Sequence, residues 1–200
     1  MLRIPNPAVL ESTCKSLPLR SPCVHCECGV DYSRNFVLNS LLSLSSGSKR
    51  QEIVPVAPAD NGLRWHVRAC DGDRRRFSDF VLTRITKASE LDEPVTEHEM
   101  MGADEQWARI VHREFAPHLG IAWPKAVKSN YGVTIGVLKI KTRAALAGYG
   151  LRRWLIDSTT DHHLDPASHQ LWLRNPQTLY GVESAALAPG DAGTDRQVVA

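Results

Sequence analysis

Leu63-Arg-Trp-His-Val-Arg-Ala69 and Phe77-Ser-Asp-Phe-Val-Leu-Thr-Arg-Ile85 are the two stretches that decide the fold. In the first, every second residue is apolar, which is typical of a strand with one buried face. Asp71-Gly-Asp73 lies between the two stretches and indicates a hairpin turn. Upstream, Phe36–Leu44 and Ile53–Val56 are rich in β-forming residues, and each is followed by a turn composition. Four short strands joined by tight turns predict a small antiparallel barrel or rolled sheet.

The chain changes character after this predicted sheet. Residues 89–105 carry seven acids and no Lys or Arg, which predicts an exposed linker. Beyond it, strand-like and helix-like patterns alternate, with a helical spacing over Thr142–Asp157, so we expect a small α/β unit. The predicted class is α+β. The predicted segments are an irregular 1–35, a barrel at 36–88, the acidic linker at 89–105, the α/β extension at 106–187 and a flexible tail at 188–200.

Composition excludes several classes of protein. The 200 residues carry 24 Lys and Arg against 22 Asp and Glu, a net charge of +2, so charge alone names no polyanionic partner. The apolar content is that of a globular protein. Because no apolar run approaches the roughly 18 residues that a membrane helix needs, we expect a cytoplasmic protein with no membrane partner.

Metal and catalytic motifs are weak. The spacing of Cys23-Val-His-Cys26-Glu-Cys28 suits zinc, but a second pair of ligands with similar spacing is missing. Asp161-His-His163 and His169 lie close together in a segment that we expect to be a solvated loop. No nucleophile elbow, phosphate-binding loop or zinc-protease motif is present. We therefore expect no cofactor, no metal and no enzymatic activity; a metal-dependent enzyme that uses the Cys and His residues remains the less favoured alternative.

Cations gather on the predicted barrel. Arg64, His66 and Arg68 share one face of an alternating strand, because side chains repeat every two residues. Guanidinium groups bind phosphate or carboxylate through paired hydrogen bonds, so this face suits an anion. The pattern also fits the solvated face of a half-buried strand, and on the pattern alone this second interpretation is favoured.

The same residues resemble a known family. Trp65-His-Val-Arg-Ala-Cys70 and Arg76-Phe-Ser-Asp-Phe-Val-Leu-Thr-Arg-Ile85 resemble the core of the WYL domain, especially that of regulators associated with phage defence. Ser43-Leu-Ser-Ser-Gly-Ser-Lys-Arg50 and Ile53-Val-Pro55 resemble the serine turn, arginine and Ile-x-Pro element of that domain. The resemblance covers about 36–88, and 107–179 is similar to the C-terminal extension of these regulators.

The resemblance implies a fold and a function. WYL domains are SH3-like or Sm-like barrels that sense ligands, and they usually follow a DNA-binding winged helix. Nucleotides or single-stranded nucleic acid are the implied effectors, and the extension implies a homodimer. The implied sensing residues are Ser43, Ser45, Arg50, His66, Arg68 and Arg84. Cys70 departs from the family pattern, which has Tyr there. We expect no helix-turn-helix within the first 35 residues, so a DNA-binding partner in trans or a truncated regulator follows as an expectation.

These observations predict a WYL-type regulatory protein that senses an anionic effector. Direct nucleic-acid binding by the barrel without a ligand switch, and a non-functional truncated regulator, are the alternatives. His66, with an ordinary pKa of about 6.5, would strengthen anion binding in mildly acidic buffer. Apolar residues of the extension are expected to form the dimer surface; they are Trp154, Leu155, Ile156, Leu171 and Trp172.

Overall fold

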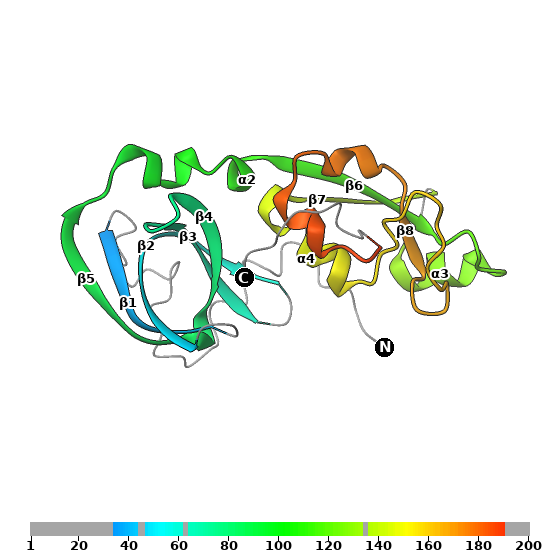
Figure 1. Ribbon diagram of the computed structural model, residues 1–200. Helices are drawn as coiled ribbons and strands as arrows, with labels where there is room; N and C mark the ends of the chain where they lie inside the picture. Colours follow the sequence, from blue (N-terminus) through cyan, green and yellow to red (C-terminus); the bar gives the residue numbers. More distant parts are fainter. Residues whose placement is uncertain (1–33, 44–46, 62–63, 134–135, 191–200) are drawn as a thin grey trace. The chain divides into compact units, whose positions relative to one another are not determined.

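The computed structural model describes residues 34–43, 47–61, 64–133 and 136–190, and the cysteines before residue 34 lie outside that part. The chain divides into two compact units between Asp104 and Glu105 (Figure 1). Each unit has its own antiparallel sheet, so the predicted α+β class is confirmed. No helix in the described ranges is long and apolar enough to cross a membrane.

Unit 1 is built on a five-stranded sheet in the order β4-β3-β2-β1-β5. Every pairing is antiparallel, and β3, β2 and β1 each have neighbours on both sides. The predicted strands all appear, and β2 is longer than expected. The strands are β1 (Arg34–Ser43), β2 (Gly47–Asp60), β3 (Trp65–Asp71), β4 (Arg76–Val81) and β5 (Ile85–Pro94).

The sheet is strongly curved, and its two edge strands follow each other in the chain (Figure 1). Only the short 3-10 helix η2 (Leu82–Arg84) separates β4 from β5. The predicted stretch Phe77–Ile85 is therefore a strand, a turn and the start of another strand. No pairing joins β4 to β5 in the described part of the chain, so this sheet is the open rolled form, which is one of the two forms that the strand pattern predicts. The closed SH3-like or Sm-like barrel that the resemblance implies is not formed by these strands.

Alternation along β3 divides the two faces of this sheet. Val67 and Ala69 belong to the apolar core, together with Ile53 of β2 and Phe80 of β4. His66, Arg68 and Cys70 point to the opposite face, because successive residues of a strand alternate. We call this the outer face of β3. All three of its side chains are nevertheless buried, so residues outside β3 cover them.

The predicted acidic linker is largely ordered. Its first half continues β5, which pairs with β1 on one side only. Charged residues are frequent on such edge strands because they discourage further strand pairing. Because of these charges, the sequence predicted a linker here and not a strand. The second half forms two 3-10 helices, η3 (Glu97–Glu99) and η4 (Met101–Ala103), and ends at the buried Asp104.

Unit 2 contains a three-stranded antiparallel sheet in the order β7-β6-β8. Its main helix was predicted as 142–157 but ends at Arg153, and Leu155 adopts a left-handed φ of 49° soon afterwards. The elements in chain order are α2 (Glu105–Ala108), β6 (Ile110–Pro117), α3 (Pro124–Tyr131), β7 (Leu138–Arg143), α4 (Ala144–Arg153), β8 (Leu171–Leu173), η5 (Pro176–Leu179) and η6 (Glu183–Leu187).

The core of unit 2 lies between the sheet and the segments around it. Phe115, Leu151, Ile156 and Leu171 are buried there. Gly148 lowers the helix propensity of α4 by about 1 kcal/mol relative to Ala, but it has a packing role. A Cβ atom at this position would lie 1.6 Å from the Ser184 carbonyl oxygen, so only glycine lets that backbone approach the helix.

Candidate anion site on the sheet of unit 1

Arg68 is the centre of a buried charge cluster on the outer face of β3. Its Nε donates to Asp104 Oδ2 at 2.7 Å and its Nη2 to Asp104 Oδ1 at 3.1 Å, a bidentate arrangement. Its Nη1 donates to Asp79 Oδ1 at 3.3 Å. Asp79 is the residue directly opposite Arg68 on β4, so the strand register provides this second partner.

This cluster is almost wholly removed from water. Arg68 is 4% exposed and Asp104 is 1% exposed. Burial alone would lower the pKa of Arg68, but the hydrogen bonds and charges of Asp104 and Asp79 outweigh it and raise the pKa. The guanidinium is therefore a permanent cation that two carboxylates compensate. Its carboxylate partners thus occupy the hydrogen-bonding positions that an external anion would need.

His66 lies on the same face but behaves differently from the sequence-based expectation. It is buried, and this burial lowers its pKa below 6.5, although the charge of Asp79 acts in the opposite direction. The neutral imidazole is therefore favoured down to a lower pH than expected. Stronger anion binding through protonated His66 in mildly acidic buffer does not follow from this geometry.

The other predicted residues gather at a different place. Leu41 of β1 pairs with Lys49 on one side and with Ile85 on the other. Arg50 and Arg84 each neighbour one of these partners, so their backbones flank the same end of β1, about 10 Å apart across two strand spacings. Ser43 ends β1 and pairs with Gly47 at this place, whereas Ser45 lies outside the described residues.

The six predicted residues thus fall into two groups. In the register of β2 with β3, Ala57 lies opposite Arg68. Arg50 lies seven residues further along β2, roughly 20 Å away at the rise of an extended strand. Arg50 is exposed and forms only a surface ion pair with Glu52, at 3.5 Å. Arg84 is partly buried. Arg50 and Arg68 therefore cannot contact one small anion together.

A cavity of about 350 Å³, which the sequence did not predict, adjoins the outer face of β3. Cys70 lines it, and burial, followed by the charges of Glu99, Asp71 and Asp104, raises the pKa of this thiol. The only sequence signal for this cavity was the acidic composition of 89–105. Its acidic lining residues are Glu52, Asp71, Glu93 and Glu99. Arg75 and His98 also line the cavity, but acidic side chains outnumber them, and none of the six predicted sensing residues is among the lining residues.

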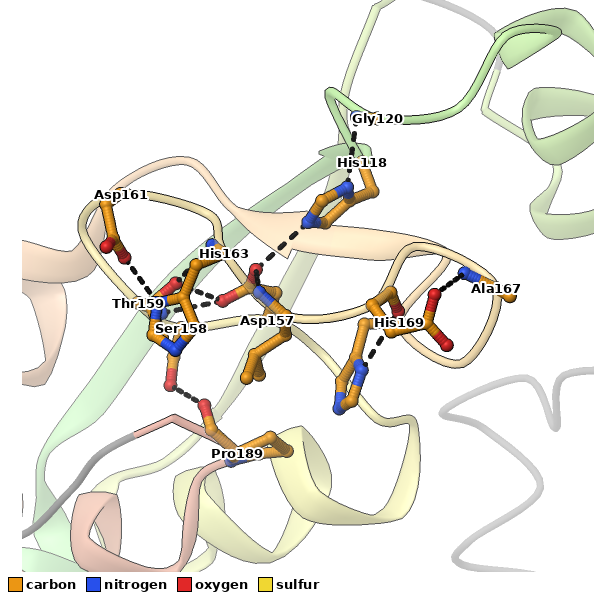
Figure 2. Close-up of polar contacts among 12 residues, drawn as sticks. His118, Gly120, Asp157, Ser158, Thr159, Asp161, His163, Ala167, His169 and Pro189 are labelled. Atoms are coloured by element: carbon orange, nitrogen blue, oxygen red, sulfur yellow. Dashed lines mark hydrogen bonds and ion pairs between the residues drawn. The ribbon is translucent and has the colours of Figure 1, made fainter.

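Unit 2 has a buried polar cluster of its own around Asp157 (Figure 2). Asp157 accepts hydrogen bonds from Thr159 N at 2.8 Å, Thr159 Oγ1 at 2.6 Å and Leu164 N at 3.3 Å. His118 Nε2 lies 3.0 Å from Asp157 Oδ2, and His118 Nδ1 accepts from Gly120 N at 3.1 Å. Burial raises the pKa of Asp157, but these hydrogen bonds outweigh it and lower the pKa. The cluster fixes the loop that follows α4.

The histidine-rich loop of unit 2 belongs to this same region (Figure 2). His163 Nδ1 lies 2.6 Å from Asp161 Oδ1, and His169 Nδ1 lies 3.2 Å from the Asp165 carbonyl oxygen. Within the described ranges, no three potential metal ligands come together. His163 and His169 therefore each contact a nearby aspartate residue. The described residues of the loop do not form a set of three ligands around one point.

The apolar surface of unit 2 differs from the predicted one. Ile156 and Leu171 are in the core, and Trp154 and Trp172 are partly buried, so of the five predicted residues only Leu155 is exposed. The large exposed side chains lie elsewhere. Trp123 is 80% exposed and Leu119 is 68% exposed, and both precede α3.

The chain is similar to known transcriptional regulators. Residues 114–179 match the family model of the BrxR transcriptional regulator, C-terminal dimerization domain. The DNA-binding transcriptional repressor CapW of Escherichia coli (strain KTE188) is 28% identical over 148 residues, which cover 73% of this chain and 48% of the relative. The CapW repressor of Stenotrophomonas maltophilia is 29% identical over 62% of this chain and 42% of its own length.

The chain thus spans about half the length of the curated relatives it matches. Among solved structures, the proteasome accessory factor B/C (PafBC) of Arthrobacter aurescens is similar, with a TM-score of 0.30 and 12% identity. That similarity covers 78% of this chain and 24% of PafBC.

The chain thus combines a rolled antiparallel sheet with a unit that matches the dimerization domain of a transcriptional regulator. These matches agree with the sequence motifs of unit 1, which resemble those of WYL-type regulators. Both CapW relatives are described as DNA-binding transcriptional repressors.

Proposed function

We propose that the chain is the sensing and dimerization part of a WYL-type transcriptional repressor. In this proposal the rolled sheet of unit 1 is the WYL-type barrel, and it binds a nucleotide or short single-stranded nucleic acid. Residues 114–179 pair two copies. DNA recognition would come from a winged helix, in the same protein or in a partner.

The observation that carries the sensing proposal is the position of Arg50, on β2, and Arg84, the last residue of η2 directly before β5, on either side of one end of β1. Arginine side chains are long enough to bridge a separation of about 10 Å between backbones. Each guanidinium can bind a phosphate through two parallel hydrogen bonds. Two arginines at this spacing suit neighbouring phosphates of one strand.

Calorimetric titration with a short oligothymidylate tests this proposal. Arg84→Lys keeps the charge but loses the planar guanidinium, so we expect a loss of about 1–3 kcal/mol in binding free energy. Arg74→Lys, in the exposed turn before β4, is the matched control and should bind like the wild type. Equal affinity for all three proteins would reduce the arginines to a diffuse basic surface and reject the proposal.

The self-association proposal is supported by the dimerization-domain match together with the exposed apolar pair Leu119 and Trp123, which lie inside the matched range. Large exposed apolar side chains are typical of interaction surfaces, and a symmetric dimer is the commonest assembly. Sedimentation of the chain at tens of micromolar should show a dimer, and a monomer at that concentration would reject this part of the proposal.

A further inference from the structure

The segment that joins the two units is attached to unit 1 at one buried point. Residues 100–103 are all exposed, and Asp104, the last residue of unit 1, is buried. Met100 and Met101 are 44% and 45% exposed, so neither is a hydrophobic anchor. The main-chain bonds that end this segment are local: Ala103 N donates to Met100 O and Asp104 N to Met101 O.

Arg68 binds the Asp104 carboxylate in the geometry that an arginine uses for an external ligand. Asp104 presents both carboxylate oxygens to Nε and Nη2 of the guanidinium, the geometry in which arginine recognises external carboxylates and phosphates. Asp79 contacts the remaining Nη1 from the neighbouring strand. The site therefore has a fixed half, made by β3 and β4, and a replaceable half at the end of a short exposed segment.

We propose that Asp104 is an internal ligand of Arg68, and that an anion of the phosphate class competes with it and releases the segment Met100–Asp104. The inference rests on the proposed function, because it assumes the same anionic effector. The proposed exchange gives the effector a second contact, with Arg68 on the outer face of β3. It also couples binding of the effector to a change in the segment Met100–Asp104. Unit 2 begins at the next residue, Glu105, so release lengthens the free connection between the two units.

The exchange is chemically balanced. Removing Asp104 alone would leave a buried cation with one carboxylate partner, which is unfavourable. An incoming phosphate oxygen restores the lost hydrogen bonds, and the released Asp104 carboxylate regains its hydration. Segments that bury few side chains open at low free energy, so the exposed residues 100–103 oppose this release only weakly.

Two measurements on the full chain test the proposal. The first is the affinity for a short oligothymidylate. Asp104→Asn removes the competing charge and keeps the side-chain volume, so it should raise affinity at least about tenfold, a change of roughly 1.4 kcal/mol. Asp92→Asn removes one exposed acid from β5 and is the matched control, with an expected change below about twofold.

The second measurement needs no variant. Saturating oligothymidylate should speed hydrogen exchange at the amides of Ala103 and Asp104 in the wild type, and thymidine, which has no phosphate, should not. Unchanged exchange at these amides in a saturated complex overturns the inference. So does an affinity of Asp104→Asn equal to that of the wild type.

The outcomes separate this inference from the proposed function. If the wild type binds and Arg84→Lys weakens binding, but neither Asp104→Asn nor the exchange rates respond, the sensing proposal stands and the internal ligand is rejected. If only Asp104→Asn binds, Asp104 masks the site and the inference is supported. If neither protein binds, both proposals fail.

Discussion

Arg68 in unit 1 and Arg113 in unit 2 are both 4% exposed and both lie on the middle strands of their sheets, yet their environments differ. Arg68 has two carboxylate partners, and its pKa is raised. Arg113 has no acidic partner in the described part of the chain, and burial lowers its pKa to about 10. It remains protonated at neutral pH. Its Nη1 donates to the Ala147 carbonyl oxygen at 3.0 Å, and its Cζ lies 5.4 Å from the centroid of the Phe115 ring.

The difference shows that burial alone does not define what a buried charge does. The partners of Arg113 are fixed parts of unit 2, a carbonyl of α4 and a ring on its own strand, so nothing there can be exchanged. One partner of Arg68 belongs to the exposed segment at the end of unit 1. A cation with a replaceable partner can take part in recognition, whereas a cation with fixed partners only supports the fold.

The largest effect is expected from Arg68→Met. This variant leaves Asp79 and Asp104 without their common cation, and breaking a buried pair in this way costs about 3–5 kcal/mol of unfolding free energy. Denaturant dependence of amide exchange in β3 measures the loss in unit 1. Arg74→Met, at an exposed position of the turn, should change it by less than about 0.5 kcal/mol.

Self-association should depend on exposed side chains and not on either buried arginine. Trp123→Ala removes the most exposed large apolar side chain of the described residues and should weaken the dimer by on the order of 2 kcal/mol, roughly thirtyfold. Tyr180 is 76% exposed but lies outside the range that matches the dimerization domain, so Tyr180→Ala is the control. Sedimentation equilibrium measures both, and an equal effect of the two substitutions would argue against an interface at Trp123.

Acid should affect the two units in different pH ranges. Burial lowers the pKa of His66, so the unfolded chain takes up a proton first and unit 1 loses stability as the pH falls below about 6.5. Asp157, whose pKa is lowered from 3.8, keeps its contribution to unit 2 until the solution is far more acidic. Amide exchange measured as a function of pH checks this order. His66→Gln should make the stability of unit 1 less dependent on pH near and below about 6.5.

The smallest effect is expected from Arg113→Met. Methionine fills a similar volume and removes a buried charge that no carboxylate compensates, so unfolding free energy should stay within about 1 kcal/mol of the wild type. Chemical denaturation followed by Trp fluorescence is suitable, because four of the five tryptophans lie in unit 2. A loss as large as that of Arg68→Met would show that the two arginines are equivalent.

Much of this comparison was accessible from the sequence of unit 1. Alternation over Leu63–Ala69 predicted β3 and correctly placed His66 and Arg68 on one face. It could not show that this face is buried, because the covering residue Asp104 is 36 positions away and reaches β3 through tertiary structure. The acids of 89–105 were visible, but composition alone does not distinguish a solvated linker from a segment that pairs with a buried arginine.

In unit 2 the sequence predicted the elements better than their exposure. The helical spacing after Thr142 indicated α4, yet Ile156 and Leu171 proved to be core residues and not dimer contacts. The type of an apolar residue does not show whether it packs in the core or at an interface, because the same residue types are found in both. Trp123 was not singled out because one aromatic residue in a short loop has no periodic pattern around it.

A double-mutant cycle between Arg68 and Asp104 tests the central claim most directly, which is that a specific and replaceable partner defines the role of this arginine. Unfolding free energies of the wild type, Arg68→Met, Asp104→Asn and the double variant give the coupling energy of the pair. We expect a coupling of at least about 1.5 kcal/mol, as measured for close charge pairs. Additivity within about 0.5 kcal/mol would contradict the account, because the two residues would then contribute independently.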